Sequence, residues 1–435
     1  MKELQSWKIN RLRKPLILMG ARQVGKTFAL KEFATFYENF IYLNFEDSPK
    51  QKLLFESTKN PEEIIKALSI EMDVSVKPHS TLIIFDEIQE CPNALNSLKY
   101  FKERANHYHV VAAGSLLGVK LKNTEGFPVG MVNFLYMYPL SFLEFLMAIG
   151  LERYVNFIQQ INNLDLIPAN LHEQLLGNFK EYLFTGGMPE VVLAYANQNN
   201  FSQIRELQNN IIMGYLLDFA KHAPKEIIMK LNQVWESIPG QLAKENKKFI
   251  YSIIRVGSRA KEFEGAIQWL KEAGLIHKVY NVQNPKLPLK AHENFEIFKI
   301  YLVDVGLLGA KTNLSAKTII HGNDFFQEFK GSYVENYVAQ ELARLNCNLN
   351  YWTSGGEAEV DYVIQFEDNI FPLEVKSGSS GKKKSLQIYQ GKYNPTISIR
   401  TSPLNLKHDG NLINIPLYLL SELPKLISLL PSTEQ

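Results

Sequence analysis

Two groups of residues in this sequence have the types and spacing that chemistry on phosphate groups requires. Near the start of the chain, Gly20, Gly25, Lys26 and Thr27 stand in the pattern Gly-x-x-x-x-Gly-Lys-Thr. Residues 355–378 read GGEAEVDYVIQFEDNIFPLEVKSG, which places isolated acids and a lysine on apolar stretches. The first pattern is typical of loops that cradle nucleotide phosphates. The second raises the question of whether an ordinary hairpin or a metal-dependent hydrolytic site lies there.

The phosphate-binding prediction depends on the context of the glycine-lysine pattern. Residues 15–30 read PLILMGARQVGKTFAL, an apolar run followed by a loop and a helical pattern. Glycines let backbone N–H groups wrap phosphates, and the start of the next helix favours negative charge. Lys26 is expected to reach the β- and γ-phosphates and Thr27 to ligate Mg²⁺, whereas a plain glycine turn is the alternative. The predicted ATP-binding residues of this loop are Gly20, Ala21, Arg22, Gln23, Val24, Gly25, Lys26 and Thr27.

A second element of the same site is predicted at residues 81–90, TLIIFDEIQE. The four apolar residues before Asp86 are typical of a parallel strand buried on both faces, and ligands bind at the carboxyl ends of such strands. Asp86 is expected to hold the Mg²⁺ shell, and Glu87 to act as the general base that polarises the attacking water. Ser115 ends another apolar run, residues 109–115, where it is expected to sense the γ-phosphate, although Gly-Ser is also a common turn.

The C-terminal stretch predicts a β-hairpin that brings two carboxylates together. Its only turn-like break is Glu367-Asp368, and a two-residue loop there places apolar residues opposite one another on one face. On the other face Asp361 lies opposite Glu374, and Lys376 shares that face because side chains alternate along a strand. Facing carboxylates stand roughly 5 Å apart at Cβ and repel each other. Asp361 and Glu374 are therefore predicted metal ligands with Lys376 beside them, and a solvated hairpin is the alternative.

A fourth residue of this candidate site precedes the hairpin. The segment GSYVENYVAQELARL carries an apolar stripe at helical spacing, with Glu335 at its margin. A glutamate on a helix, Asp361 on a strand, and Glu374 and Lys376 on the next strand resemble the PD-(D/E)XK nuclease superfamily. The resemblance implies a catalytic site with a second divalent metal ion, although a nuclease-like fold alone does not establish cleavage. We interpret the run Lys382–Lys384 as a basic loop, and a phosphate-binding patch is the alternative.

The segment between the two sites is predicted to be mostly helical. Residues 150–225 read as helices that form a lid, and residues 226–285 give three helical patterns and then a strand, the order of a winged helix-turn-helix. The second of these helical patterns is QLAKENK and the third is RAKEFEGAIQWLKEAGLI. The third helix mixes acids with bases, so DNA contact competes with an ordinary solvated face or a protein contact. The candidate phosphate contacts are Lys244, Lys247, Lys248, Arg255, Arg259, Lys261 and Lys271.

Length and composition limit the class of protein. A chain of 435 residues exceeds one ordinary core, so two to four domains are expected. The net charge is only +2, and nucleic-acid binding would therefore depend on local basic patches. Two cysteines and an N-terminus without a signal-peptide core indicate a cytoplasmic protein. Pro139 and Glu144 interrupt the most membrane-like stretch, residues 134–150, which predicts a strand followed by a helix and no membrane span.

Seven motifs together resemble a prokaryotic family of AAA-type ATPases with a C-terminal domain of unknown function. They are GARQVGKT, IIFDEIQE, AAGSLLG, YPLSFLEF, FTGGMPEVV, YLLDFAK and YLVDVGLLGA, and they extend from residue 20 to residue 310. The resemblance implies ATP binding with hydrolysis, and a nuclease-like domain at the end of the chain. Many members of the family carry an arginine after a glycine shortly before the PLSF segment. This chain departs from that pattern, because Met131 follows Gly130, so the resemblance implies no arginine finger at that place.

The sequence as a whole predicts an α/β protein with a parallel P-loop sheet, a helical lid, a winged helix-turn-helix and a PD-(D/E)XK-like domain. The expected domain ranges are 1–149, 150–225, 226–310 and 311–435. ATP and Mg²⁺ are the expected cofactors and DNA the expected partner, with ATP turnover gating access of DNA to the C-terminal site. The alternatives are a nucleotide-dependent switch or scaffold that cleaves nothing, and a transcription regulator acting through the winged helix. Oligomerisation is left open.

Overall fold

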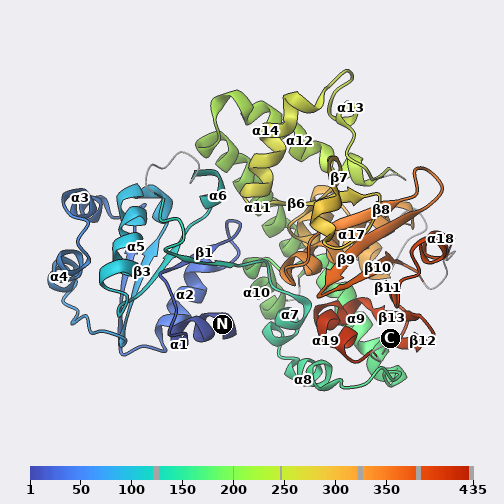
Figure 1. Ribbon diagram of the computed structural model, residues 1–435, viewed down its shortest axis with the longest axis horizontal. Helices are drawn as coiled ribbons and strands as arrows, with labels where there is room; N and C mark the ends of the chain where they lie inside the picture. The colour runs from blue at the N-terminus through green and yellow to red at the C-terminus, as the bar shows by residue number, and fades with distance from the viewer. Residues whose placement is uncertain (121–126, 199, 245–246, 322–326, 379–383, 431–435) are drawn as a thin grey trace. The chain divides into compact units, whose positions relative to one another are not determined.

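The computed structural model describes most of the chain and divides it into two compact units (Figure 1). The described residues are 1–120, 127–198, 200–244, 247–321, 327–378 and 384–430. The first unit comprises Met1–Tyr138 and Glu272–Gly274, and the second Pro139–Lys271 and Leu275–Gln435. Lys382 and Lys383 of the predicted basic loop lie outside the described residues, whereas Lys384 begins a helix. The predicted division into four domains stays a prediction.

The first unit contains a parallel sheet of five strands in the order β2-β3-β4-β1-β5, the order of P-loop NTPases. The strands are β1 (Leu16–Met19), β2 (Asn39–Asn44), β3 (Thr81–Asp86), β4 (His109–Ala113) and β5 (Asn133–Tyr136). All pairings between them are parallel, and β3 and β4 are buried along their whole length. The strands predicted from the apolar runs are therefore confirmed, with ends that differ by a few residues.

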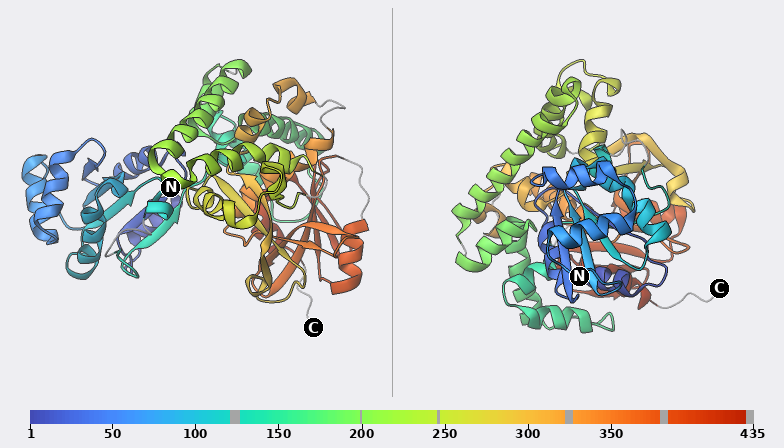
Figure 2. Two further views of the ribbon diagram at one scale, coloured as in Figure 1. Left: turned by 90° about the horizontal axis from the view of Figure 1, so that it is seen from above. Right: turned by 90° about the vertical axis from the view of Figure 1, so that its left-hand side faces the viewer.

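Helices cover both faces of this sheet (Figures 1 and 2). Alternate strand residues explain the two layers, because Ile83 and Phe85 pack into one apolar cluster, while Leu82 and Ile84 pack into the other. The helical segments are α1 (Lys2–Ile9), α2 (Lys26–Ala34), α3 (Pro49–Ser57), α4 (Pro61–Glu71), η1 (Ile88–Glu90), α5 (Pro92–Arg104) and α6 (Leu117–Lys120). The carboxyl ends of β1, β3 and β4 thus lie at the same edge of the sheet. The predicted site residues lie at the ends of these strands or directly after them.

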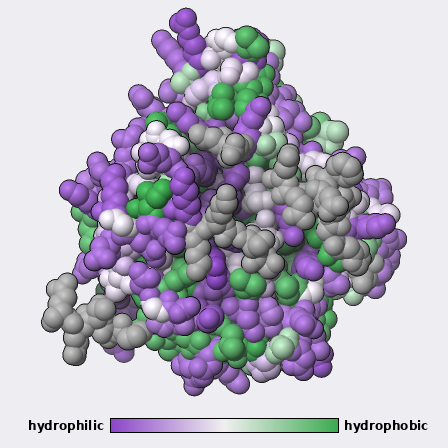
Figure 3. Space-filling view, turned by 90° about the vertical axis from the view of Figure 1, so that its right-hand side faces the viewer, coloured by the Kyte–Doolittle hydropathy of each residue, from purple (hydrophilic) through white to green (hydrophobic). Residues whose placement is uncertain are grey.

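The second unit begins with a helical region, as predicted for residues 150–225. Its helices are α7 (Phe142–Ala148), α8 (Glu152–Gln160), α9 (Ala169–Thr185), α10 (Pro189–Gln198) and α11 (Phe201–His222). The membrane-like stretch 134–150 forms β5 and α7, which confirms the predicted strand and helix. Within the described ranges, no helix combines the length and the apolar character needed to span a membrane. Hydrophilic side chains predominate on the face shown in Figure 3.

Two of the resemblance motifs meet at one buried acid in this unit. Asp304 begins α15 (Val305–Lys311) and accepts hydrogen bonds from the backbone N–H groups of Leu307, at 2.9 Å, and Gly187, at 2.6 Å. A Cβ on Gly187 would lie 2.1 Å from the carbonyl oxygen of Leu140, so only glycine fits there. Burial raises the pKa of Asp304 to about 6, against the effect of the N–H donors. The contact joins the GGMPEVV turn to the YLVDVGLLGA segment.

The segment predicted as a winged helix contains three helices and a hairpin. They are α12 (Lys225–Leu242), α13 (Tyr251–Ile254), α14 (Ala260–Glu272), β6 (Ile276–Val282) and β7 (Glu293–Leu302), with β6 and β7 antiparallel. The predicted position of the second helix is wrong, because Gln241 and Leu242 end α12 and the short helix begins only at Tyr251. The predicted apolar positions Phe263, Ile267 and Leu270 of α14 are buried, and Gly274 ends the segment at a φ of 73°.

The strands of the second unit form one mixed sheet of eight strands in the order β12-β13-β11-β10-β9-β8-β6-β7. The other strands are β8 (Asn350–Thr353), β9 (Glu359–Phe366), β10 (Asn369–Val375), β11 (Ser398–Ser402), β12 (Lys407–Asp409) and β13 (Leu412–Pro416). The helical segments along them are η3 (Leu289–His292), α16 (Ala316–His321), α17 (Gln327–Arg344), α18 (Lys384–Tyr393), η5 (Leu417–Glu422) and α19 (Leu423–Ser428). The hairpin β6–β7 therefore shares a sheet with the hairpin β9–β10.

Candidate functional site

The predicted phosphate loop connects β1 to α2 in a conformation that requires its glycines. Gly20 has a φ of 146° and Gly25 a φ of 90°, values that side chains disfavour. A Cβ on Gly20 would lie 2.3 Å from the carbonyl oxygen of Met137, so a larger residue would displace the loop. Helix α2 begins at Lys26, directly after the second glycine. The first turn of that helix is therefore open toward the loop, as a phosphate site needs.

Lys26 is folded back onto this loop. Its Nζ donates to the carbonyl oxygens of Gly20, at 3.0 Å, and Ala21, at 2.7 Å. Burial lowers the pKa of Lys26 to about 8, against the opposing effect of the nearby carboxylates of Glu87 and Asp86. The ammonium group thus lies inside the loop that the sequence predicts to wrap phosphates.

The two predicted Mg²⁺ ligands of the first unit are in direct contact. The Thr27 hydroxyl donates to Oδ2 of Asp86 at 2.6 Å, and the Asp86 side chain is almost completely buried. Tyr42 of β2 donates to the same oxygen at 2.8 Å. Burial and the hydrogen bond to Asp86 raise the pKa of Tyr42, so its hydroxyl stays a donor. A hydroxyl and a carboxylate are hard oxygen ligands of the kind that Mg²⁺ prefers, so the donor set fits that ion.

The predicted general base and the predicted γ-phosphate sensor are hydrogen-bonded to each other. The Ser115 hydroxyl donates to Oε2 of Glu87 at 3.4 Å, and Nε2 of Gln89 donates to the same oxygen. Nε of Arg22 in turn donates to Oγ of Ser115 at 3.1 Å. Glu87 has a φ of 49°, a left-handed conformation that is rare outside glycine and clusters at functional sites. Gln89 and Tyr42 were not predicted from the sequence, because neither follows a phosphate-binding motif.

The hairpin at the second candidate site has the predicted register. Pairing runs from Asn369 with Phe366 to Leu373 with Tyr362, as a loop at Glu367-Asp368 requires. The ladder ends at that last pair, one residue short of the predicted pairing of Asp361 with Glu374. Oδ2 of Asp361 instead accepts a hydrogen bond from the backbone N–H of Val375 at 2.8 Å.

A β-bulge explains this departure. On the other side of β9, Asn350 pairs with Val363 and Trp352 with Val360, so β9 has one more residue than β8 between the two pairs. A bulge turns the side chain at the extra position and interrupts the regular alternation. It also buries Val360 and Val363 in one apolar cluster with Trp352. The alternative of a solvated hairpin therefore does not hold, because Val363 and Pro372, on the same face as Asp361 and Glu374, are buried.

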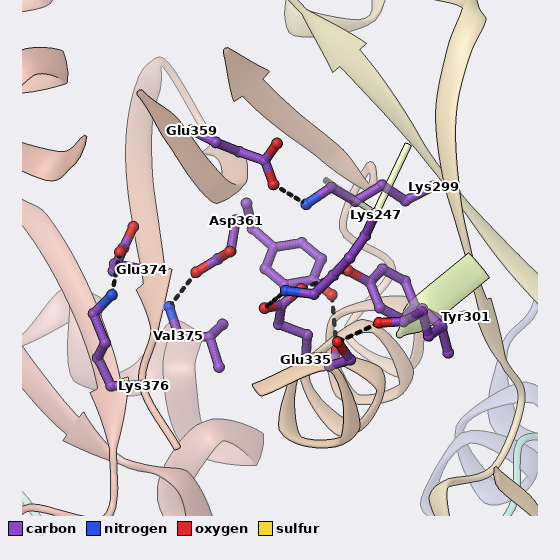
Figure 4. A network of polar contacts seen from close by, with 12 residues as sticks. Lys247, Lys299, Tyr301, Glu335, Glu359, Asp361, Glu374, Val375 and Lys376 are labelled. Carbon is purple, nitrogen blue, oxygen red and sulfur yellow. Dashed lines mark hydrogen bonds and ion pairs between the residues drawn. The ribbon is translucent and has the colours of Figure 1, made fainter. Parts of the chain in front are cut away.

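The four predicted residues of this site come together, and lysines accompany them (Figure 4). Nζ of Lys247 lies 2.5 Å from Oε1 of Glu335, and Nζ of Lys376 lies 2.5 Å from Oε1 of Glu374. A third ion pair joins Lys299 to Glu359. These seven residues, which include Asp361, form what we call the carboxylate–lysine cluster. The cluster draws on the loop before α13, on α17 and on the strands β7, β9 and β10.

The charges in this cluster shift the pKa values of Glu335 and Asp361 in opposite directions. Burial would raise the pKa of Glu335, but Lys247 and Lys299 together hold it below the ordinary value. Tyr301 also donates to Oε2 of Glu335 at 2.8 Å. For Asp361, burial and the carboxylates of Glu335 and Glu374 raise the pKa well above the usual range. The glutamate is therefore held as an anion, whereas the aspartate favours its neutral form.

Three of the seven cluster residues were not predicted for this site. Lys247 was a candidate phosphate contact, but its side chain is only 15% exposed and points into the cluster. Lys299 and Glu359 were not considered, although a single lysine in the apolar run FKIYL is a usable signal of a buried ion pair. Among the described residues, no group of three or more His, Cys, Asp or Glu side chains is arranged to hold a metal ion. The metal ion predicted at Asp361 and Glu374 stays a prediction.

The cations predicted to contact DNA occupy different environments. Arg255 is paired with Glu262 at 2.9 Å, and Nζ of Lys271 donates to the Tyr280 hydroxyl at 3.3 Å. Arg259 and Lys261, at the start of α14, have exposed side chains, as does Lys244. Some cations of the predicted basic set therefore face solvent, whereas Lys247 is largely buried in the carboxylate–lysine cluster.

Comparison with known proteins covers both units. Residues 12–146 match a family model described as an AAA domain, and residues 176–318 and 330–420 match two domains of unknown function, DUF8612 and DUF4143. The fold is similar to a Walker-type ATPase of Pyrococcus abyssi, at 15% identity and a TM-score of 0.44, over 72% of this chain and 95% of that chain. It is also similar to Cdc6p of Pyrobaculum aerophilum, at 12% identity and a TM-score of 0.26, over 74% and 93% of the two chains. A search of curated proteins gave no match. The chain thus carries an AAA-type P-loop ATPase domain, followed by two domains of unknown function.

Proposed function

We propose that the first unit binds ATP with Mg²⁺ and hydrolyses it to ADP and phosphate. The observation that carries this proposal is the contact of Thr27 with the buried Asp86, at 2.6 Å, in a domain that matches an AAA model. Lys26 lies inside the same loop, and Glu87 follows Asp86 directly. These are the parts that P-loop hydrolysis needs: a phosphate cradle, a metal shell and a group that orients water.

Each residue has a distinct task in this reaction. The loop N–H groups and Lys26 bind the β- and γ-phosphates, and Thr27 and Asp86 would hold the Mg²⁺ ion, which neutralises phosphate charge when bound. Glu87 accepts the proton of the water that attacks the γ-phosphorus. Tyr42 keeps the Asp86 carboxylate in place through its 2.8 Å hydrogen bond. The test is phosphate release from ATP by wild-type protein and by Glu87→Gln; no release by the wild type contradicts hydrolysis.

We also propose that the carboxylate–lysine cluster is a PD-(D/E)XK-like site that does not cleave nucleic acid. Its support is the balance of charge: three lysines pair with Glu335, Glu359 and Glu374. The remaining acid, Asp361, favours its neutral form and is hydrogen-bonded to the backbone. Lys247 and Lys299, which are not part of the PD-(D/E)XK pattern, thus compensate two of the acids where a nuclease would use a divalent cation. This favours the switch or scaffold alternative for the second unit.

The silent-site proposal predicts that the protein leaves DNA intact. Wild-type protein with ATP and with either Mg²⁺ or Mn²⁺ should yield no more cleaved single- or double-stranded DNA than Asp361→Ala does. The reason is that the glutamates of the cluster are already paired with lysines, so a metal ion would have to displace an ion pair to bind them. The measurement is a gel assay on end-labelled DNA, with Lys376→Ala as a second variant. Cleavage by the wild type that disappears in both variants would contradict the proposal.

DNA binding is proposed for the exposed start of α14. Arg259 and Lys261 are exposed there, in a helix–helix–helix–hairpin order typical of winged helices. Arg259→Ala and Lys261→Ala should each weaken binding to duplex DNA about threefold to tenfold and lower its salt dependence, because each removes one phosphate contact. Fluorescence anisotropy at two salt concentrations measures this. Lys407→Ala, an exposed lysine on β12, is the matched control, and equal losses in all three variants would exclude this face.

A further inference from the structure

Arg22 lies inside the phosphate loop, and its side chain contacts Ser115, which is hydrogen-bonded to the general base. It stands two residues after Gly20 and four before Lys26. Its Nε donates to Oγ of Ser115 at 3.1 Å, and the Ser115 hydroxyl donates to Oε2 of Glu87 at 3.4 Å. A continuous chain of hydrogen bonds therefore leads from the loop that wraps the phosphates to the residue that activates water.

The carboxylate at the end of this chain is held in a constrained conformation. Glu87 has a φ of 49°, and its Oε2 also accepts a hydrogen bond from Gln89. A strained backbone persists only where its surroundings fix it, so the contacts of the side chain help to determine where the carboxylate points. Loss of the Ser115 contact would leave Glu87 with fewer constraints on its orientation.

A phosphate group is a stronger hydrogen-bond partner for the Arg22 guanidinium than the Ser115 hydroxyl is. Arginine binds phosphate oxygens through charge-assisted, often bidentate hydrogen bonds, which are roughly twice as strong as neutral ones. Arg22 and Lys26 stand four residues apart in the same loop. Lys26 and Arg22 can therefore contact the same nucleotide.

We infer that Arg22 is a γ-phosphate ligand within the same chain, and that Ser115 transmits its position to Glu87. This inference rests on the proposed ATPase function. With ATP bound, Arg22 contacts the γ-phosphate and releases Ser115, which changes the hydrogen bonds that orient Glu87. With ADP bound there is no γ-phosphate, and the chain from Arg22 to Glu87 stays closed. Arg22 is thereby a substrate-contacting residue, and Ser115 is a positioning residue.

The experiment compares the affinities for ATP and ADP. Arg22→Ala should lower the affinity for a non-hydrolysable ATP analogue about 10- to 100-fold, because one charge-assisted contact is lost, while the affinity for ADP changes less than about threefold. Arg22→Lys should recover part of the preference for the triphosphate. The control is Arg11→Ala, which removes an exposed arginine of the same unit. Isothermal titration calorimetry gives both affinities.

Ser115→Ala separates positioning from binding. It should keep the affinity for the ATP analogue within about threefold and lower kcat about tenfold, since only the orientation of the base is disturbed. If the Arg22–Ser115 hydrogen bond only stabilises the loop, Arg22→Ala should lose ATP and ADP affinity equally. That result overturns the inference. If wild-type protein binds the analogue but hydrolyses no ATP, the proposed function fails, while the ATP-over-ADP ratio still decides the role of Arg22. No nucleotide binding by the wild type overturns both.

Discussion

The Glu87→Gln protein is expected to bind ATP within about threefold of wild-type affinity and to release phosphate at least 100-fold more slowly, by the usual size of general-base effects, about 10² to 10⁴. Glutamine has nearly the same shape and keeps an oxygen that can accept the hydrogen bonds of Ser115 and Gln89. It cannot take a proton from water. The change therefore removes an interaction made in the transition state and spares those made with the substrate.

The measurement for this variant is steady-state phosphate release together with equilibrium binding of ATP in Mg²⁺. Glu103→Gln is the matched control, because Glu103 makes only a 3.9 Å ion pair with Lys99 on the surface of α5. That control should hydrolyse ATP at the wild-type rate. A Glu87→Gln protein that turns over ATP within about threefold of wild type, on the scale of general-base effects, would remove Glu87 from the reaction.

The second large effect is expected in the carboxylate–lysine cluster, where Lys299→Ala should destabilise the protein by about 3–5 kcal/mol. The Lys299 side chain is fully buried; it pairs with Glu359 and lies 4.6 Å from the centre of the Tyr351 ring. Its removal leaves a carboxylate without its buried counter-ion. Breaking one half of such a pair is costly, because the desolvation of the remaining charge is no longer offset.

The pH dependence of this contribution has a defined sign. Burial lowers the pKa of Lys299, but the carboxylates of Glu359 and Glu335 outweigh it and raise the pKa from its ordinary 10.5 to about 12. A raised lysine pKa means that the folded state binds the proton more tightly than the unfolded state. The stabilisation is thus fully present below pH 10.5 and is lost as the pH rises through about 12.

Urea unfolding followed by tryptophan fluorescence measures the Lys299 effect. Three of the four tryptophans, Trp235, Trp269 and Trp352, lie in the second unit and report on its unfolding. Lys407→Ala is the matched control, since Lys407 and Asp409 form an exposed pair at 3.6 Å, of a kind that contributes at most about 1 kcal/mol. A loss below about 1 kcal/mol in Lys299→Ala would show that the cluster is not a buried ion network.

The sequence predicts those parts of the fold that depend on neighbouring residues. The strand before the phosphate loop, the strand ending in Asp86 and the hairpin turn at Glu367-Asp368 each follow from a short run of residue types. The loop at Gly20 also follows from a short run of residues, because its glycine spacing and the helix after it lie within one segment. Such features are local in the chain, so their physical causes are visible in the sequence.

The contacts that sequence reasoning missed join distant segments. Arg22 and Ser115 are 93 residues apart, and Lys247 and Glu335 are 88 residues apart. The bulge at Asp361 arises from pairing with β8, whose partners cannot be read from the hairpin alone. Lys247 looked like a surface cation because its neighbours are charged, yet its long side chain reaches a buried glutamate. Burial of a charge is decided by tertiary partners, which no short pattern specifies.

ATP hydrolysis by the first unit, with a metal ion held by Thr27 and Asp86, is tested most directly by phosphate release from the wild-type protein over a titration of Mg²⁺. Release is expected to rise with Mg²⁺ to saturation and to stop when EDTA is added, because the ion must neutralise the phosphates as the bond to the γ-phosphorus breaks. The contradicting result is a purified, folded protein that binds ATP and releases no phosphate at any Mg²⁺ concentration.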